Sequence, residues 1–242
     1  MYFLLSNVFR KTKAETVATG RAYGGIAHED RAAERRDALI QAATQVFGTV
    51  GFRKATVKSI CRQAKLNDRY FYAAFDSADH LLRVTYEHHA QRLHASLQQV
   101  IQKQGEKLEA KVAAGLRVFF LFLRDPCAAR VLMLEVMGVS AETDATYQRN
   151  IFEFARQIIS FVDKATQDAL GDHDDQRIVG FALVGAMINA GTAWLLSDYR
   201  DSEEKMVHNC SQVLLGTYAY AVKQARQSAR SARSTSATRT RR

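Results

Sequence analysis

Two short helical patterns between Thr56 and Phe75, TVKSICRQAKLNDRYFYAAF, constrain the fold more than any other stretch. Apolar residues recur about one helical turn apart in the first pattern: Val57, Ile60, Cys61 and Ala64. In the second, the apolar side chains point one way: Leu66, Phe71, Ala74 and Phe75. Thr56 and Asn67 are suitable N-caps. Helices shorter than about 12 residues barely repay their nucleation cost, so both need a further helix to pack on.

The segment Arg36 to Val50 supplies that helix, and Gly51 follows as a C-cap glycine would. Its apolar face is made of five residues: Leu39, Ala43, Val46, Phe47 and Val50. A supporting helix followed by a helix, a tight turn and a helix presenting Arg and Tyr outward is the helix-turn-helix layout. In that layout the last helix enters the DNA major groove. The sequence therefore predicts a DNA-binding unit.

Residues 35–82 resemble the DNA-binding domain of the TetR (tetracycline-repressor) family throughout their length. The matching features are the aromatic of ATQVF, the GF pair after the first helix, T-V-x-x-I-C in the second, and Y-F-Y-x-x-F before a capping Ser77. The resemblance implies a transcription regulator, most often a repressor, that binds a palindromic double-stranded operator as a homodimer. It also implies release from DNA by a small-molecule effector.

The resemblance implies eight DNA-contacting residues: Arg36, Thr56, Lys58, Asn67, Asp68, Arg69, Tyr72 and Ala73. Thr56 and Lys58 would touch the DNA backbone or the groove edge, and Tyr72 would touch a phosphate. The bases would be faced by the remaining residues of the third helix: Asn67, Asp68, Arg69 and Ala73. Arginines that precede or begin the first helix, Arg36 among them, are placed to reach the backbone or the minor groove. A merely solvated basic face explains them equally well.

Three positions depart from the family pattern. Lys65 stands where the family usually has glycine, so we expect a non-glycine residue with positive φ in the turn. Asp68 puts a carboxylate at the start of the reading helix, where it favours the helix dipole, repels phosphate and could accept a hydrogen bond from cytosine. Ala78 lacks the basic side chain that the family often places there. These residues therefore do not determine which DNA base sequence the protein would recognise.

Charge is divided unevenly along the 242 residues. Residues 1–70 hold 13 Lys and Arg against 6 Asp and Glu, and residues 223–242 hold 7 basic residues and no acidic one. Residues 71–222 carry 14 basic against 19 acidic residues. A basic head and tail on an acidic body is the distribution expected when one end approaches phosphates.

The fold class expected is all-α, because the chain has 47% hydrophobic residues and a single proline. We expect a flexible arm over 1–29, with Gly20 to Gly25 flexible, and a three-helix helix-turn-helix domain over 30–78. A helical ligand-binding and dimerisation bundle follows over 79–226, and a disordered basic tail over 227–242. That tail would either add nonspecific DNA affinity or have no assigned role.

The helices expected in the body cover residues 79–103, 106–124, 127–137, 142–170, 178–196 and 202–226. The resemblance implies that the last two form a four-helix dimer interface with their copies. Residues 178–196 carry no charge over 19 positions, but three glycines and flanks without Lys or Arg bias favour a fully buried helix over a membrane span. Gly180, Gly185 and Gly191 would let another helix come close.

The resemblance places an inducer-binding pocket in the body. Large flexible or aromatic side chains there are candidates to line an apolar effector pocket: Phe119, Phe120, Met133, Met137, Phe152, Met187 and Trp194. Core packing is the alternative for each of them.

Three distant cysteines, Cys61, Cys127 and Cys210, form no CxxC pair and suit a reducing compartment, so we expect a cytoplasmic protein. The apolar N-terminus precedes the charges and shows no cleavage site, so a signal peptide is not expected.

No catalytic, cofactor-binding or metal-binding residues are predicted. HExxH, GxSxG and phosphate-cradling glycine motifs are missing, and we expect His88, His89 and His94 to be ordinary surface histidines. Two alternative functions remain open from the sequence: an enzyme acting on an apolar substrate in the body, and a nonspecific architectural DNA-binding protein. The latter would bind specific and random duplexes equally.

Overall fold

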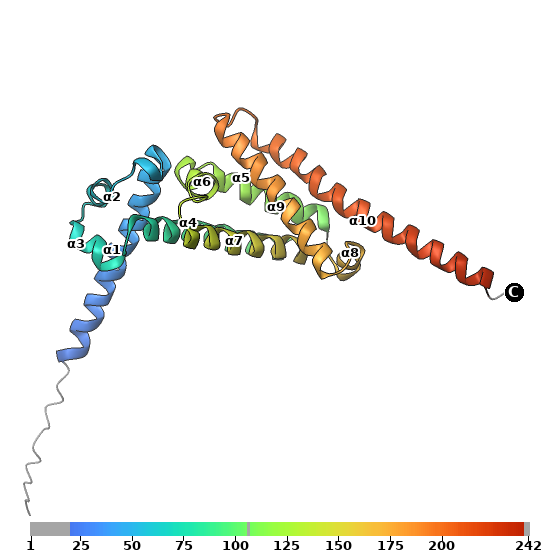
Figure 1. The fold of residues 1–242 in the computed structure, drawn as a ribbon, viewed down its shortest axis with the longest axis horizontal. Helices are drawn as coiled ribbons and strands as arrows, with labels where there is room; N and C mark the ends of the chain where they lie inside the picture. The colour runs from blue at the N-terminus through green and yellow to red at the C-terminus, as the bar shows by residue number, and fades with distance from the viewer. Residues whose placement is uncertain (1–19, 106, 240–242) are drawn as a thin grey trace, which may run out of the picture.

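A computed structural model describes the backbone of residues 20–105 and 107–239, and the side chains of residues 30–105 and 107–227. These ranges contain ten α-helices, one 3-10 turn and no strand, so the all-α prediction is confirmed. Figure 1 shows a small N-terminal head beside a longer helical body, with α4 running from one into the other.

The head consists of α1 (Gly20–Val50), the 3-10 turn η1 (Phe52–Lys54), α2 (Val57–Ala64) and α3 (Asp68–Ala74). Its core is made of side chains with at most 1% exposure: Leu39, Ala43, Phe47, Ile60, Phe71 and Phe75. Thr56 caps α2 as predicted, in a reciprocal capping box with Ser59. Asn67 occupies the N-cap position of α3 but makes no side-chain capping bond. The two short helices are thus held by packing on α1.

The turn between α2 and α3 has the strained backbone that the sequence predicts. Lys65 ends α2 in the left-handed region, with φ 56° and ψ 38°. Its backbone N–H donates to the Arg62 and Cys61 carbonyls, which satisfies the end of the helix. A side chain at this backbone conformation is costly, so the turn depends on packing of the helices on either side.

The body contains α4 (Ala78–Gln102), α5 (Leu108–Leu123), α6 (Pro126–Met133), α7 (Ala141–Ser160), α8 (Lys164–Ala169), α9 (His173–Leu196) and α10 (Glu203–Arg239). Ser77 caps α4 as expected, accepting from the His80 N–H. In the body, α5 packs against α4 and α10, while α7 packs against α9. Trp194 of α9 lies edge-on to Phe120 and Tyr199, and its indole N–H donates to the Asp201 carbonyl at 2.8 Å.

The single helix expected over 142–170 is wrong. α7 ends at Ser160, and Asp163 starts the separate helix α8 by accepting from the Thr166 N–H at 2.7 Å. An aspartate offers this local bond only outside a helix, so it interrupts an otherwise continuous amphipathic pattern. The helix expected over 127–137 is also shorter, ending at Met133.

The two ends of the described chain are more helical than predicted. Gly20 to Gly25 belong to α1, and α10 continues through residues 227–239. The expected flexibility and disorder there are wrong for these positions, because extending an existing helix adds one hydrogen bond for each residue fixed and no proline interrupts either segment. Residues 1–19 and 240–242, the rest of both predicted segments, lie outside the described residues.

Helix α9 is only partly buried, contrary to the prediction. Gly180 approaches α7 and Gly191 approaches α5, so both serve close packing within the chain. Ile178 and Leu196 are 58% and 66% exposed on the opposite side. By length and composition α9 could cross a membrane (mean hydropathy 1.7), but here one face packs on α7.

Candidate nucleic-acid interface and body cavity

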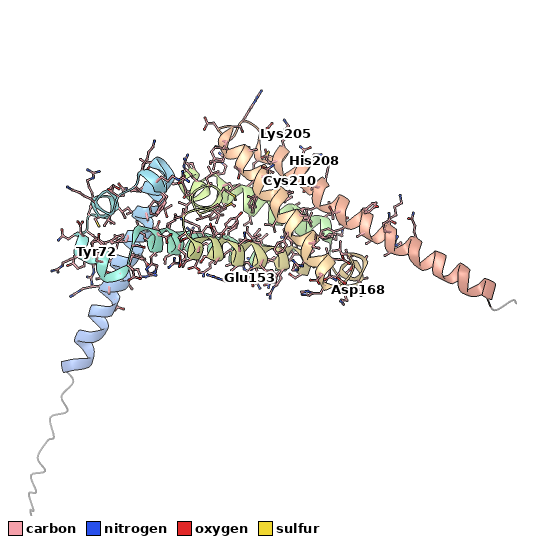
Figure 2. All side chains as sticks on the ribbon, viewed as in Figure 1. Tyr72, Glu153, Asp168, Lys205, His208 and Cys210 are labelled. Atoms are coloured by element: carbon pink, nitrogen blue, oxygen red, sulfur yellow. The ribbon has the colours of Figure 1, made fainter. Side chains whose placement is uncertain are left out.

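The predicted DNA-contacting residues in and beside α2 and α3 are all exposed on the head. The set comprises Thr56, Lys58, Asn67, Asp68, Arg69, Tyr72 and Ala73, and every member is exposed. Tyr72, 64% exposed, extends from α3 at the end of the molecule farthest from α10 (Figure 2). Further exposed cations flank this surface: Arg53, Lys54, Arg62 and Lys65. A convex helical surface with this charge can enter a groove and neutralise phosphates.

Tyr70, which sequence reasoning missed, organises the arginines beside this surface. The Arg69 guanidinium lies 4.7 Å from the Tyr70 ring centre and donates to its hydroxyl at 2.9 Å. Arg35 lies 4.8 Å from the same ring centre. The Arg69 hydrogen bond and both positive charges lower the pKa of Tyr70. Arg36 is half-buried, with its guanidinium 5.1 Å from the Phe75 ring centre.

Asp68 influences a thiol inside the head. Burial, then the nearby Asp68 carboxylate, raises the pKa of the Cys61 thiol to about 11, so the thiol stays protonated at neutral pH.

The junction of head and body contains a buried histidine, so the prediction of an ordinary surface residue is wrong for His89. Its exposed fraction is 1%, and its Nε2 lies 2.9 Å from the Thr44 hydroxyl. Because Thr44 donates its proton to the Ile40 carbonyl, Nε2 must donate to Thr44, and Nδ1 is left without a partner. Burial, then the charges of His88 and Arg92, lowers the pKa of His89 to about 4.

A second contact ties η1 to the loop after α6. Glu135 accepts from the Phe52 backbone N–H at 2.7 Å and pairs with Arg130 at 2.8 Å. Nearby, a Cβ atom added at Gly48 would clash with the Cys127 backbone, so α1 and α6 approach closely. Helix α6 is thus fixed to the head on one side.

The body encloses an apolar cavity of about 120 Å³ between α4, α5, α6, α7, α9 and α10. Of the seven residues suggested for a pocket, Phe119, Met133 and Met187 line it. Their neighbours include Leu93, Leu97, Leu132, Ile151, Phe154 and Leu214. Because Leu132 and Met133 belong to α6, one helix contacts both the cavity and the head.

The other four suggested residues lie elsewhere. Phe120 is fully buried against Trp194, at a ring separation of 5.3 Å, behind the cavity wall. Met137 is 60% exposed, and Phe152 packs against Phe181 at the surface. Periodicity placed these side chains on helices but could not tell which helix face meets the void.

The polar groups at the cavity were missed because each stands alone in the sequence. Tyr86, Tyr147, Tyr218, Lys111 and Gln157 all line it. The Tyr218 hydroxyl donates to the Ile158 carbonyl at 3.1 Å, and burial raises the pKa of Tyr86 and Tyr218. Among the residues described, no cluster of three or more His, Cys, Asp or Glu could hold a metal ion.

Similarity to known proteins agrees with this architecture. The profile described as "Bacterial regulatory proteins, tetR family" matches residues 39–84. No curated protein sequence matches the chain significantly.

Several solved structures share the fold. The fatty acid degradation regulator FadR from Bacillus halodurans is 20% identical, with a TM-score of 0.64, over 75% of this chain and 95% of that one. The regulator FadR from Bacillus subtilis, solved with stearoyl-CoA, is 18% identical, with a TM-score of 0.62, over 73% and 96%. A TetR-like regulator from Rhodococcus sp. RHA1 is 16% identical, with a TM-score of 0.59, over 76% and 96%.

The family profile covers α1 to α4, where the exposed reading helix, its capped partner and their common core are found. Regulators of this family are non-enzymatic transcription factors. The chain belongs to the TetR family of DNA-binding transcriptional regulators.

Proposed function

We propose that the protein is a cytoplasmic repressor that binds a palindromic operator as a homodimer and is released by an effector in the body cavity. The observation that carries the proposal is that α6 contacts both the apolar cavity and the head. A ligand that favours one position of α6 would alter the position of the head by its difference in affinity for the two states. The proposed units are the DNA-binding domain, 30–78, and the regulatory domain, 79–226.

A twofold partner is supported by outward-facing small and apolar residues on the last two long helices. On α9 these recur at helical spacing: Ile178, Ala182, Gly185, Ala193 and Leu196. On α10 they are Val213, Gly216 and Tyr220. Side chains placed at Gly185 or Gly216 would meet nothing within 4 Å, so this surface has room for another helix. A second copy would bring two reading helices to the two halves of a palindrome.

The proposed DNA contacts are those that the family motif implies. Thr56, Lys58 and Tyr72 would contact the backbone or groove edge, and Asn67, Asp68, Arg69 and Ala73 would face bases. Arg36 would act from its position against Phe75. To reach a base, the Arg69 guanidinium has to leave Tyr70, so Tyr70 holds it beside the groove before binding.

Operator binding can be tested on the palindrome nearest the protein's own gene with purified full-length protein. Tyr72→Ala and Arg69→Ala should each lower operator affinity at least tenfold while leaving the oligomer size unchanged, and the exposed Arg200→Ala serves as control. Undiminished affinity in both variants would refute the assignment. Equal binding of operator and random duplex at several salt concentrations would instead indicate an architectural protein.

A further inference from the structure

The apolar cavity lies next to a polar surface groove between α4 and α7, which we call the vestibule. Four residues line both spaces: Ile101, Lys111, Gln157 and Phe161. The vestibule is further lined by polar groups: His94, Glu153, Arg156 and Ser160. Glu153, labelled in Figure 2, marks its outer edge on α7. A ligand lying across both spaces would have an apolar part and a polar part.

Gln157 stands at the boundary with an unsatisfied acceptor. Its side-chain N–H donates to the His94 carbonyl at 3.1 Å, which fixes the orientation of the amide. The residue is 7% exposed, and its Oε1 has no hydrogen-bond partner. A buried acceptor without a partner is costly, and a carbonyl oxygen can be satisfied only by a donor. The site therefore favours a ligand with an N–H or O–H group at this depth.

Lys111 supplies positive charge at the same boundary. Its ammonium is half-buried and donates to the Phe161 carbonyl at 3.4 Å. It forms no ion pair with the described side chains, although its charge contributes to lowering the pKa of the exposed Asp163. In the vestibule Arg156 pairs with Glu153 at 3.3 Å, so one negative charge there is already matched. The Lys111 charge is left to favour an anion.

The size of the cavity limits the apolar part. A cavity of about 150 Å³ can hold one benzene molecule, so a cavity of about 120 Å³ has room for about five carbon atoms. The walls are formed by aliphatic and aromatic side chains, which suit an unbranched hydrocarbon chain.

We propose that the effector is an anionic molecule with a single short hydrocarbon chain: about five chain carbons in the cavity, an N–H donor at Gln157 Oε1, and an anionic group beside Lys111. This inference deepens the proposed function and rests on it, because the cavity is taken as the effector site. Free N-acyl amino acids and acyl thioesters of coenzyme A share this chemistry.

Calorimetric titration of the full-length protein with matched ligands tests each part. N-hexanoylglycine should bind about tenfold more tightly than O-hexanoylglycolate, which replaces the N–H by an oxygen. Gln157→Met should reduce that preference to less than about twofold. The preference is the ratio of the affinities of the two ligands for the same protein. A general loss of stability in the variant would lower both affinities and leave this ratio unchanged.

The contribution of the anionic group to binding is tested with ligands that have the same hydrocarbon chain. N-hexanoylglycine should bind about fivefold more tightly than neutral N-hexanoylglycinamide, and Lys111→Met should remove this difference while Lys164→Met, exposed on α8, keeps it. Equal affinity for hexanol and N-hexanoylglycine would overturn the proposal. Tighter binding of hexanoyl-CoA would identify the thioester as the source of the shared chemistry.

An operator-release assay separates this inference from the proposed function. Binding with the expected preferences but without release of DNA would support the ligand chemistry and contradict the repressor mechanism. Release by an uncharged apolar compound, with no binding of N-hexanoylglycine, would support the mechanism and overturn the ligand class.

Discussion

The head and the body differ in how completely their cores are filled. In the head, α1 and three short elements close around Leu39, Phe47, Ile60 and Phe71, none of which exposes any surface. In the body, the helices leave a cavity of about 120 Å³ between them. A filled core suits a head that presents one rigid surface, and the space left in the body suits the ligand site that we propose there.

The largest expected effect tests the difference in packing between the two cores directly. Phe47→Ala should lower the free energy of unfolding by about 3–5 kcal/mol, because it opens a void in a filled core. Met133→Ala, in a cavity wall, should cost about 1–2 kcal/mol, since the methionine already borders space. Urea denaturation of both variants provides the measurement. Equal losses would show that the two cores are packed alike.

His89 links the two regions and should make their joint stability depend on pH. Its pKa is about 4 in the folded protein against an ordinary value near 6.5, so between these values the unfolded chain binds more protons. Stability should therefore be fully present above about pH 6.5 and fall by about 2–3 kcal/mol as pH drops toward 4.

Chemical denaturation at several pH values measures this effect. His89→Gln should flatten the pH dependence in that window, while the exposed His208→Gln should not. A profile that His89→Gln leaves unchanged would assign the titration to other groups.

Glu135 provides a second link, from the loop after α6 to η1. Glu135→Ala should cost about 2 kcal/mol, because the Phe52 N–H and the Arg130 guanidinium lose a charged acceptor. The exposed Glu142→Ala should cost less than about 0.5 kcal/mol. Thermal unfolding compares them, and equal midpoints would show that the contact adds nothing to the attachment of the head.

The smallest expected effect tests the backbone strain in the turn between α2 and α3. Lys65→Gly should stabilise the protein by about 0.5–1 kcal/mol, because glycine adopts φ 56° without the penalty of a side chain. The same change at Lys58, inside α2, should destabilise by about 1 kcal/mol. If Lys65→Gly also destabilises, the turn is not strained.

Local chemistry was sufficient for much of the fold. Thr56 and Ser77 cap their helices through bonds to residues three positions away, so the chain reveals them without tertiary information. The positive φ of Lys65 and the exposure of Tyr72 likewise follow from turn geometry and helical periodicity. The break at Asp163 was missed, because an amphipathic pattern continues through it.

The sequence alone determined the reading unit, because its caps, its turn and its apolar faces are contained within about 48 consecutive residues. Only the tertiary structure decided the junction and the cavity. His89 meets Thr44 across 45 positions, Gln157 meets His94 across 63, and Glu135 meets Phe52 across 83. A lone histidine or glutamine has no periodic signal, since its partner is chosen by how the helices pack and not by its neighbours in the chain.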